Sequence, residues 1–308
     1  MNVMRSVLLA GSESLWLRRR APRFWFVRKS VSRFMPGENV SDALKAAAEL
    51  RDQGLGTVFT YLGENVTEAS EADQVTNHYA MVLERIRESG LQTEISVKLT
   101  HLGLDLNPQL AFANLAKLIE HAGRESVVWI DMEGSHYVNA TLELFHRARA
   151  AYPNVGVCVQ AYLYRTEKDL ESLIPLGAAI RLVKGAYREP PEIAIPRKRD
   201  IDENYFALAK RLLSEEARRA GVRAAIGTHD PRLIRRIQAW VQSNGRGKNE
   251  PLEFQMLYGI QRALQLQLAQ EGWKSIVLIA YGDCWFPWFM RRLAERPANT
   301  LLVARNLF

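Results

Sequence analysis

Cysteine is almost absent from this sequence, and long apolar runs are missing altogether. Cys158 and Cys284 are the only cysteines among 308 residues. This excludes a disulfide-rich secreted scaffold and favours a reducing compartment. Without an apolar run of roughly 18 residues, no transmembrane helix is expected. No cluster of Cys and His has the spacing of a zinc site, so the sequence predicts no metal.

Acidic residues are rare at the start of the chain, where arginine and aromatic residues dominate. Residues 1–35 intersperse Trp16, Trp25 and Phe26 with basic side chains and contribute much of the formal net charge of +7. Such a mixture suits a membrane surface or a nucleic-acid backbone. A solvated helical arm fits the composition equally well, and an Arg-rich transit peptide is also left open.

The helix-breaking residues and the change of pattern near residue 45 predict two parts of the chain. Residues 1–45 are predicted to form an N-terminal helical arm that a Pro-Gly pair interrupts, and residues 46–308 to form the catalytic domain. Ser41 would cap a helix that runs to Leu50, because its hydroxyl can accept a bond from an unpaired backbone N–H. No low-complexity linker separates a further domain.

Short apolar runs alternate with longer amphipathic stretches through the rest of the chain. The runs are mostly apolar at every position, as in strands covered on both faces, and they lie at 57–61, 94–99, 127–132, 155–160, 179–183, 224–228, 253–257 and 276–281. Between them, apolar residues recur three and four positions apart, as in helices. This rhythm over roughly 250 residues predicts an α/β protein with a (βα)8 TIM-type barrel. A doubly wound sheet would need a glycine-rich turn after the first strand, which Leu62-Gly63-Glu64 does not provide.

Polar side chains follow nearly every predicted strand, although the strand interiors are apolar. In a TIM-type barrel the active site is built at the C-terminal ends of the strands. Burying a charge without a partner is costly, so we interpret the set as a ligand site. The residues at the strand ends are Lys98, Asp131, Gln160, Arg181, Lys184, Thr228, His229, Gln255 and Tyr281, together with Leu257.

The charge of this set predicts an anionic ligand. Arg291 and Arg292 add two guanidinium forks, each able to hold a carboxylate with paired hydrogen bonds. Glu295 lies four residues after Arg291 and three after Arg292, so it faces both on a helix. Because the segment is rich in Trp and Phe and directly follows the last strand, we expect a C-terminal helix packed over the barrel mouth.

Residue chemistry alone leaves two kinds of enzyme open. A lysine at a barrel strand end, such as Lys98, can form a Schiff base as in aldolases. The run from Lys184 to Arg188 could instead cradle a phosphate through backbone N–H groups, as in a cofactor-dependent enzyme.

The strand-end motifs, taken together and in order, resemble those of the proline dehydrogenase family over roughly residues 45–305. The length is similar to that of the monofunctional bacterial enzymes, which are FAD-dependent. The motifs are Ser96-Val97-Lys98-Leu99-Thr100, Ile130-Asp131-Met132-Glu133, Val159-Gln160-Ala161-Tyr162, Arg181-Leu182-Val183-Lys184-Gly185-Ala186-Tyr187, Gly227-Thr228-His229-Asp230, Glu253-Phe254-Gln255-Met256-Leu257-Tyr258-Gly259, Tyr281-Gly282 and Arg291-Arg292-Leu293-Ala294-Glu295.

The resemblance implies oxidation of L-proline to Δ1-pyrroline-5-carboxylate by hydride transfer to FAD, with electrons passed to a membrane quinone. Asp131 and Arg181 would be catalytic, Asp131 by supporting Lys98 and Arg181 by stabilising charge on the flavin. The implied substrate-binding residues are Lys98, Tyr187, Leu257, Tyr281, Arg291, Arg292 and Glu295. The implied cofactor-binding residues are Met132, Gln160, Arg181, Lys184, Gly185, Ala186, Thr228 and His229.

The resemblance also carries expectations about specificity and location. Tyr281 is expected to crowd the ring carbon next to the reacting one and so to favour proline over 4-hydroxyproline; a hydroxyproline dehydrogenase is the alternative. The chain is expected in the cytoplasm, with the basic arm holding it peripherally at the inner face of a membrane. No nucleic acid partner is expected.

Overall fold

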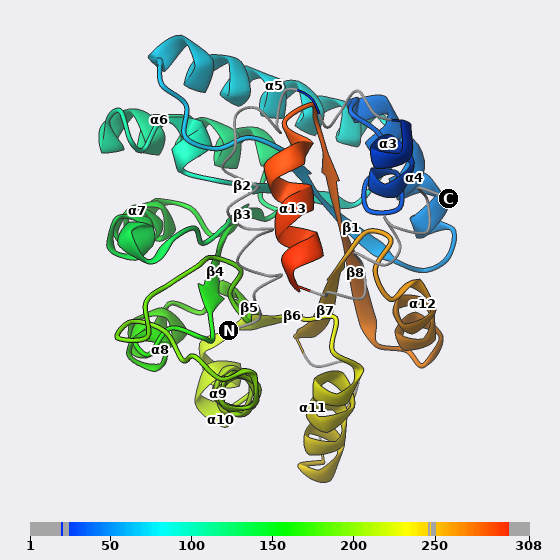
Figure 1. Cartoon of the computed structure of the whole chain (residues 1–308). Coiled ribbons are helices and arrows are strands. Elements are labelled where there is room, and N and C mark those ends of the chain that lie inside the picture. Colours follow the sequence, from blue (N-terminus) through cyan, green and yellow to red (C-terminus); the bar gives the residue numbers. More distant parts are fainter. Residues whose placement is uncertain (1–19, 21–24, 246, 248–250, 296–308) are drawn as a thin grey trace.

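Eight parallel strands close into a barrel that helices surround (Figure 1). The computed structural model describes residue 20, residues 25–245, residue 247 and residues 251–295. Each strand pairs with the next along the chain, and β8 returns to β1 with Tyr281 opposite Tyr61. This closure confirms the predicted TIM-type barrel and excludes the doubly wound sheet.

The elements alternate as the sequence rhythm predicts. The strands are β1 (Gly56–Tyr61), β2 (Thr93–Val97), β3 (Val128–Ile130), β4 (Val155–Gln160), β5 (Ala179–Val183), β6 (Arg223–Gly227), β7 (Leu252–Leu257) and β8 (Lys274–Tyr281). The α-helices are α3 (Trp25–Val31), α4 (Val40–Arg51), α5 (Ala69–Glu88), α6 (Pro108–Ala122), α7 (Val138–Ala151), α8 (Thr166–Leu173), α9 (Lys198–Leu212), α10 (Glu215–Ala220), α11 (Pro231–Ser243), α12 (Arg262–Gln270) and α13 (Trp285–Glu295). Short 3-10 turns are η2 (Thr100–Leu102), η3 (Ser135–Tyr137) and η4 (Ile174–Leu176).

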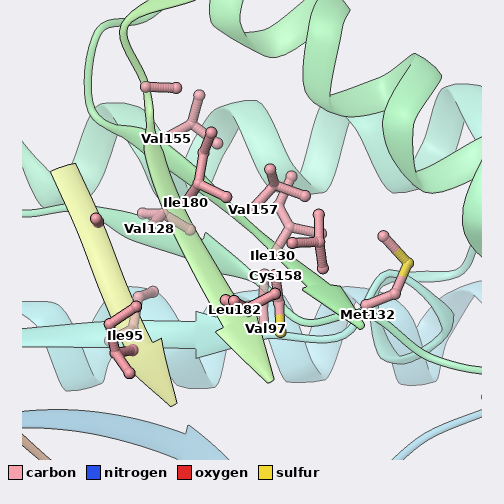
Figure 2. Close-up of a cluster of buried hydrophobic side chains, with 14 of the residues drawn as sticks. Ile95, Val97, Val128, Ile130, Met132, Val155, Val157, Cys158, Ile180 and Leu182 are labelled. Carbon is pink, nitrogen blue, oxygen red and sulfur yellow. The ribbon is translucent and has the colours of Figure 1, made fainter. Parts of the chain in front are cut away.

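Side chains alternate between the two faces of each strand, so each strand serves two cores. The outward side chains pack under the helices, and Figure 2 shows part of this layer with Ile95, Val128, Val157 and Ile180. Because the inward faces are covered too, the strands read as continuous apolar runs. Their predicted ends differ from the observed ends by no more than one or two residues.

The inward side chains near the N-terminal ends of the strands fill the barrel floor. An apolar cluster there consists of Val58, Trp129, Ala179, Ala225 and Ile276. Around it, Arg223 pairs with Glu94 at 2.5 Å and with Glu253 at 2.7 Å. These opposite charges satisfy one another, which leaves the C-terminal ends of the strands, the barrel mouth, as the place for a ligand.

One expectation at the N-terminal side is wrong. Helix α4 begins at Val40 and its N-cap residue is Asn39, so Ser41 lies inside the helix, where its hydroxyl accepts a bond from Arg85. Helix α4 also runs across the expected boundary between residues 45 and 46. Trp16 and most of the basic arm lie outside the described residues. No helix in the described part of the chain is long and apolar enough to cross a membrane.

Candidate active site

Strand alternation brings most of the predicted site residues to the inside of the barrel mouth. Asp131, directly after β3, and Arg181, within β5, each lie two positions beyond an inward floor residue, Trp129 and Ala179 respectively. Lys98, Gln160 and Leu257 follow the same phase on their strands. The arrangement therefore gathers cationic, acidic and amide groups around one opening.

Arg181 is held by a short network inside the barrel. Its Nη1 donates to Asp131 Oδ1 at 2.9 Å and to Ser96 Oγ at 2.9 Å, and Ser96 Oγ donates to Asp131 Oδ1 at 2.7 Å. The guanidinium lies 4.5 Å from the centroid of the Trp129 ring. Asp131 thus holds Arg181, and none of its described bonds is the expected support of Lys98.

The rest of the Arg181 guanidinium is buried and has no hydrogen-bond partner among the described residues. Within the part of the chain that the structure describes, neither Nε nor Nη2 makes a hydrogen bond. Oε1 of Gln255 makes none there either, while Nε2 of Gln255 donates to Glu253 Oε1 at 2.6 Å. Buried polar groups are normally bonded, because leaving one unpaired costs about 1–3 kcal/mol. Two donors and an acceptor left over inside the barrel fit a planar ligand whose edge carries both acceptors and a donor.

Lys98 lies among three titratable groups at the mouth. It is 9% exposed and interacts electrostatically with Glu64, Glu133 and His101. Burial raises the pKa of Glu133 to about 7, although a bond from Thr100 Oγ1 at 2.6 Å and the charge of Lys98 oppose the rise. Burial, with help from Lys98, lowers the pKa of His101 to about 3, so its ring is neutral near pH 7.

Helix α13 carries the arginine pair over the mouth (Figure 1). Arg291 donates to both carboxylate oxygens of Glu64, at 2.9 Å and 3.3 Å, and its guanidinium lies 5.7 Å from the centre of the Tyr187 ring. Burial alone would raise the pKa of Glu64, but Arg291 and Lys98 outweigh it, and the pKa lies below its ordinary value. Arg292 lies 5.9 Å from the ring of Trp288. Glu295 ends the helix, and its side chain is outside the described part.

The loop after β5 carries Lys184, Gly185, Ala186 and Tyr187 to the rim of the mouth. Lys184 Nζ pairs with Asp202 at 2.5 Å and Asp230 at 3.1 Å. Gly185 has φ +112°, and a Cβ there would lie 2.1 Å from the Tyr162 ring. No other residue fits this position without strain. The backbone N–H groups of this loop are thus held in one conformation at the rim.

His229 and Thr228 close the side of the mouth between β6 and β7. His229 Nε2 accepts a bond from Leu257 N at 2.9 Å, which places the proton of the neutral ring on Nδ1. Thr228 is buried, and its hydroxyl accepts a bond from the backbone N–H of Asp230 at 3.2 Å. Both contacts make these side chains rigid parts of the rim.

Gln160 and Met132 occupy different sides of their strands. Gln160 is inward, and its Nε2 donates to the carbonyl of Glu133 at 2.8 Å. Met132 is 8% exposed and packs in the outward layer shown in Figure 2. Its side chain points away from the barrel interior, so only its backbone faces the mouth.

Tyr281 does not lie where the sequence led us to expect it. Ile276 is inward, so Leu278 shares its face while Tyr281 points outward. The Tyr281 hydroxyl bonds Nε2 of His78 on α5 at 2.9 Å, and its ring packs on Tyr61. This orientation does not support the expected contact of Tyr281 with a substrate ring, which stays a prediction. Leu278, which is partly exposed, and Ala280 share the inward face of β8 with Ile276.

Four residues at the mouth were not assigned a role from the sequence. Ser96 lies two positions before Lys98, and Glu133 lies two positions after Asp131. The two-residue period of a strand could have indicated that each shares a face with its neighbour. Glu64 lies in a loop and His101 in the short 3-10 turn η2, where no strand period indicates the direction of a side chain.

The sequence and the fold are similar to those of one known protein family. The sequence model of the family described as "Proline dehydrogenase" matches residues 43–305. "Proline dehydrogenase 2" of Bacillus subtilis subsp. natto is 37% identical over 308 residues, 100% of this chain and 99% of that protein. "Proline dehydrogenase" of Deinococcus radiodurans is 35% identical over 286 residues, 90% of this chain and 89% of that protein.

Among solved structures, proline utilization A from Bdellovibrio bacteriovorus, inactivated by N-propargylglycine, has the same fold. The TM-score is 0.80 at 23% identity, and the match covers 96% of this chain and 37% of that one. The relatives match over nearly their full length, and the family model covers most of the barrel. Both findings confirm the family that the sequence motifs indicated. The chain belongs to the proline dehydrogenase family.

Proposed function

We propose that this chain oxidises L-proline to Δ1-pyrroline-5-carboxylate, with FAD as its cofactor. The observation that carries the proposal is the convergence of Lys98, Arg181 and Arg291 on one opening. A small zwitterion needs such a cationic pocket for its carboxylate. Because the family is flavin-dependent, the same pocket must also accept a flat redox group.

Arg291 and Arg292 are the groups that would bind the proline carboxylate, with Lys98 beside them. Guanidinium forks bind a carboxylate through two parallel bonds, and this fixes both its position and its plane. Glu64 already holds Arg291 in a bidentate pair, so that guanidinium is oriented before a substrate arrives. Fixing the substrate in this way removes orientational entropy from the barrier.

Arg181, Gln255 and the Gly185 loop are the groups that would hold FAD. The unbonded Nε and Nη2 of Arg181 and the unbonded Oε1 of Gln255 fit the donors and acceptors of an isoalloxazine edge. The remaining implied contacts are Met132, through its backbone, and Gln160, Lys184, Ala186, Thr228 and His229. The bound flavin would supply a two-electron acceptor for the hydride from the ring carbon, while the amine nitrogen gives up its proton.

The purified protein is expected to be yellow, to release FAD in acid and to turn over L-proline. A Schiff-base enzyme using Lys98 needs no chromophore, and borohydride would inactivate it only with a carbonyl substrate present. The absorption spectrum, followed by anaerobic bleaching with L-proline or trans-4-hydroxyproline, separates these cases. Colourless protein would refute the flavin assignment. Faster bleaching by hydroxyproline than by proline would show that hydroxyproline, and not proline, is the preferred substrate.

The chain is further proposed to pass electrons to a membrane quinone while bound peripherally at the inner face. Support comes from the family resemblance and from the basic cluster at residues 18–20 with Trp16 beside it. We expect the enzyme to co-sediment with anionic vesicles that contain a quinone and to lose this binding when Arg18 and Arg19 become glutamate. Neutral vesicles are the control. If the unchanged enzyme and the variant sedimented equally with anionic vesicles, the arm would not be the membrane-binding part.

A further inference from the structure

The apolar face of helix α13 is covered by the arm that precedes the barrel. One cluster of buried side chains joins Val31, Phe34 and Met35 of the arm to Trp285 and Phe289 of α13. The Phe34 and Phe289 ring centroids are 5.9 Å apart. Trp285 and Phe289 are four residues apart, so they form a stripe on one side of the helix. The arm thus holds the side of the helix that carries this stripe.

A hydrogen bond ties the start of α13 to the same arm. Trp285 Nε1 donates to Glu38 Oε1 at 2.9 Å, although 247 positions separate the two residues in the chain. Trp285 is only 2% exposed. A buried indole N–H needs an acceptor, and Glu38 supplies it from outside the barrel.

The arm is itself fixed against the barrel beside the mouth. Gly259 follows β7 with φ +73°, and a Cβ there would lie 1.5 Å from the carbonyl oxygen of Arg33. The arm backbone therefore runs directly over the loop after Leu257, with no room for a side chain between them. This contact fixes the chain next to residues 34–38, which pack against α13.

The rotation of α13 about its axis decides where its arginines point. A guanidinium reaches roughly 9 Å from a helix axis, so a rotation of about 20° moves it by roughly 3 Å, a full hydrogen-bond length. Among the described ion pairs Glu64 holds Arg291 and not Arg292, and it does so from the barrel side. The contacts with Phe34 and Glu38 act on the first two turns of the same helix.

We propose that Phe34 and Glu38 are positioning residues, which set the orientation of α13 and thereby the aim of the Arg291–Arg292 pair at the substrate carboxylate. The inference rests on the proposed oxidation of proline. Neither residue touches the reacting atoms, so their removal should act on proline binding and leave the flavin site intact.

The test compares Phe34→Ala and Glu38→Ala with their conservative partners Phe34→Leu and Glu38→Gln, which keep apolar volume and an acceptor oxygen. Ser32→Ala is the matched control, because Ser32 is exposed on the same arm and bonds only the carbonyl of Lys29 in the described structure. The alanine variants should raise the proline KM five- to tenfold, with kcat and flavin content within twofold of the starting enzyme. The conservative variants should restore the KM, and the control should not change it.

Hydrogen exchange of the α13 amides gives a second readout that needs no turnover. We expect residues 285–293 to exchange at least fivefold faster in both alanine variants, while the β-strand amides are unchanged. If the starting protein fails to oxidise proline, the proposed function falls, and exchange alone still decides whether the arm positions α13. Glu38 is exposed, so Glu38→Ala carries the test if Phe34→Ala does not fold. Wild-type exchange in α13, or unchanged KM in an active alanine variant, would overturn the inference.

Discussion

Replacing Arg292 or Arg291 by methionine should raise the proline KM by about 10- to 150-fold. A charge-assisted hydrogen bond contributes about 1.5–3 kcal/mol, and each 1.4 kcal/mol corresponds to about a tenfold change in affinity. Methionine keeps most of the apolar length of the side chain on α13. The flavin should stay bound, because the arginine pair lies on α13 and not on the β5 loop.

Steady-state kinetics with L-proline and L-prolinamide measure this effect directly. The amide lacks the carboxylate charge, so the starting enzyme should discriminate strongly against it, and the arginine variants should discriminate less. Arg218→Met is the matched control: it removes the same charge from α10, where Arg218 pairs with Glu215. An arginine variant with unchanged KM and unchanged discrimination would show that this residue does not bind the carboxylate.

Much of the mouth could be predicted because strand phase and strand ends suffice to locate it. Lys98, Asp131 and Gln160 lie at the ends of apolar runs, and the predicted ends of these runs are within two residues of the observed strand ends. An error of that size still leaves a strand-end residue at the mouth. Arg181 lies two positions inside β5, yet it faces the same interior, since two positions are one full period.

The direction of a side chain cannot be predicted where the sequence leaves the phase of its strand open by one residue. Tyr281 is the last residue of β8 and so lies level with the barrel mouth. Its side chain nevertheless faces His78 rather than the mouth. The run 276–281 is apolar throughout, so no polar alternation reveals which side is inward. Only packing, with Ile276 in the floor cluster, distinguishes Leu278 from Tyr281.

Contacts between distant loops could not be predicted at all. Glu64 follows β1 and meets Arg291 across 227 positions, and Glu38 meets Trp285 across 247. Neither pair has a local pattern, because each depends on how the arm and α13 pack over a barrel that is already closed. These loop contacts orient the Arg291–Arg292 pair. The residues of the pair could therefore be predicted, while the direction in which they point could not.

Changing Arg181 to lysine should lower the rate of flavin reduction by about 100-fold while the proline KM changes little. Removing a single preorganised donor from a site of developing charge typically costs about 10²–10³ in rate. Lysine keeps the positive charge but cannot reproduce both the bonds of Nη1 to Ser96 and Asp131 and the unbonded Nε and Nη2. The effect thus tests the fork geometry rather than the charge.

Ser96→Ala provides the graded comparison for this prediction. It removes one of the two acceptors of Arg181 Nη1 but leaves Asp131, so the reduction rate should fall by a smaller factor. Anaerobic stopped-flow mixing with proline measures the rate apart from product release, and the flavin spectrum before mixing checks occupancy. If Arg181→Lys bleached as fast as the starting enzyme at equal occupancy, Arg181 would have no part in the hydride step. If both variants lost flavin equally, the Ser96–Asp131–Arg181 network would serve to hold the cofactor and not to speed its reduction.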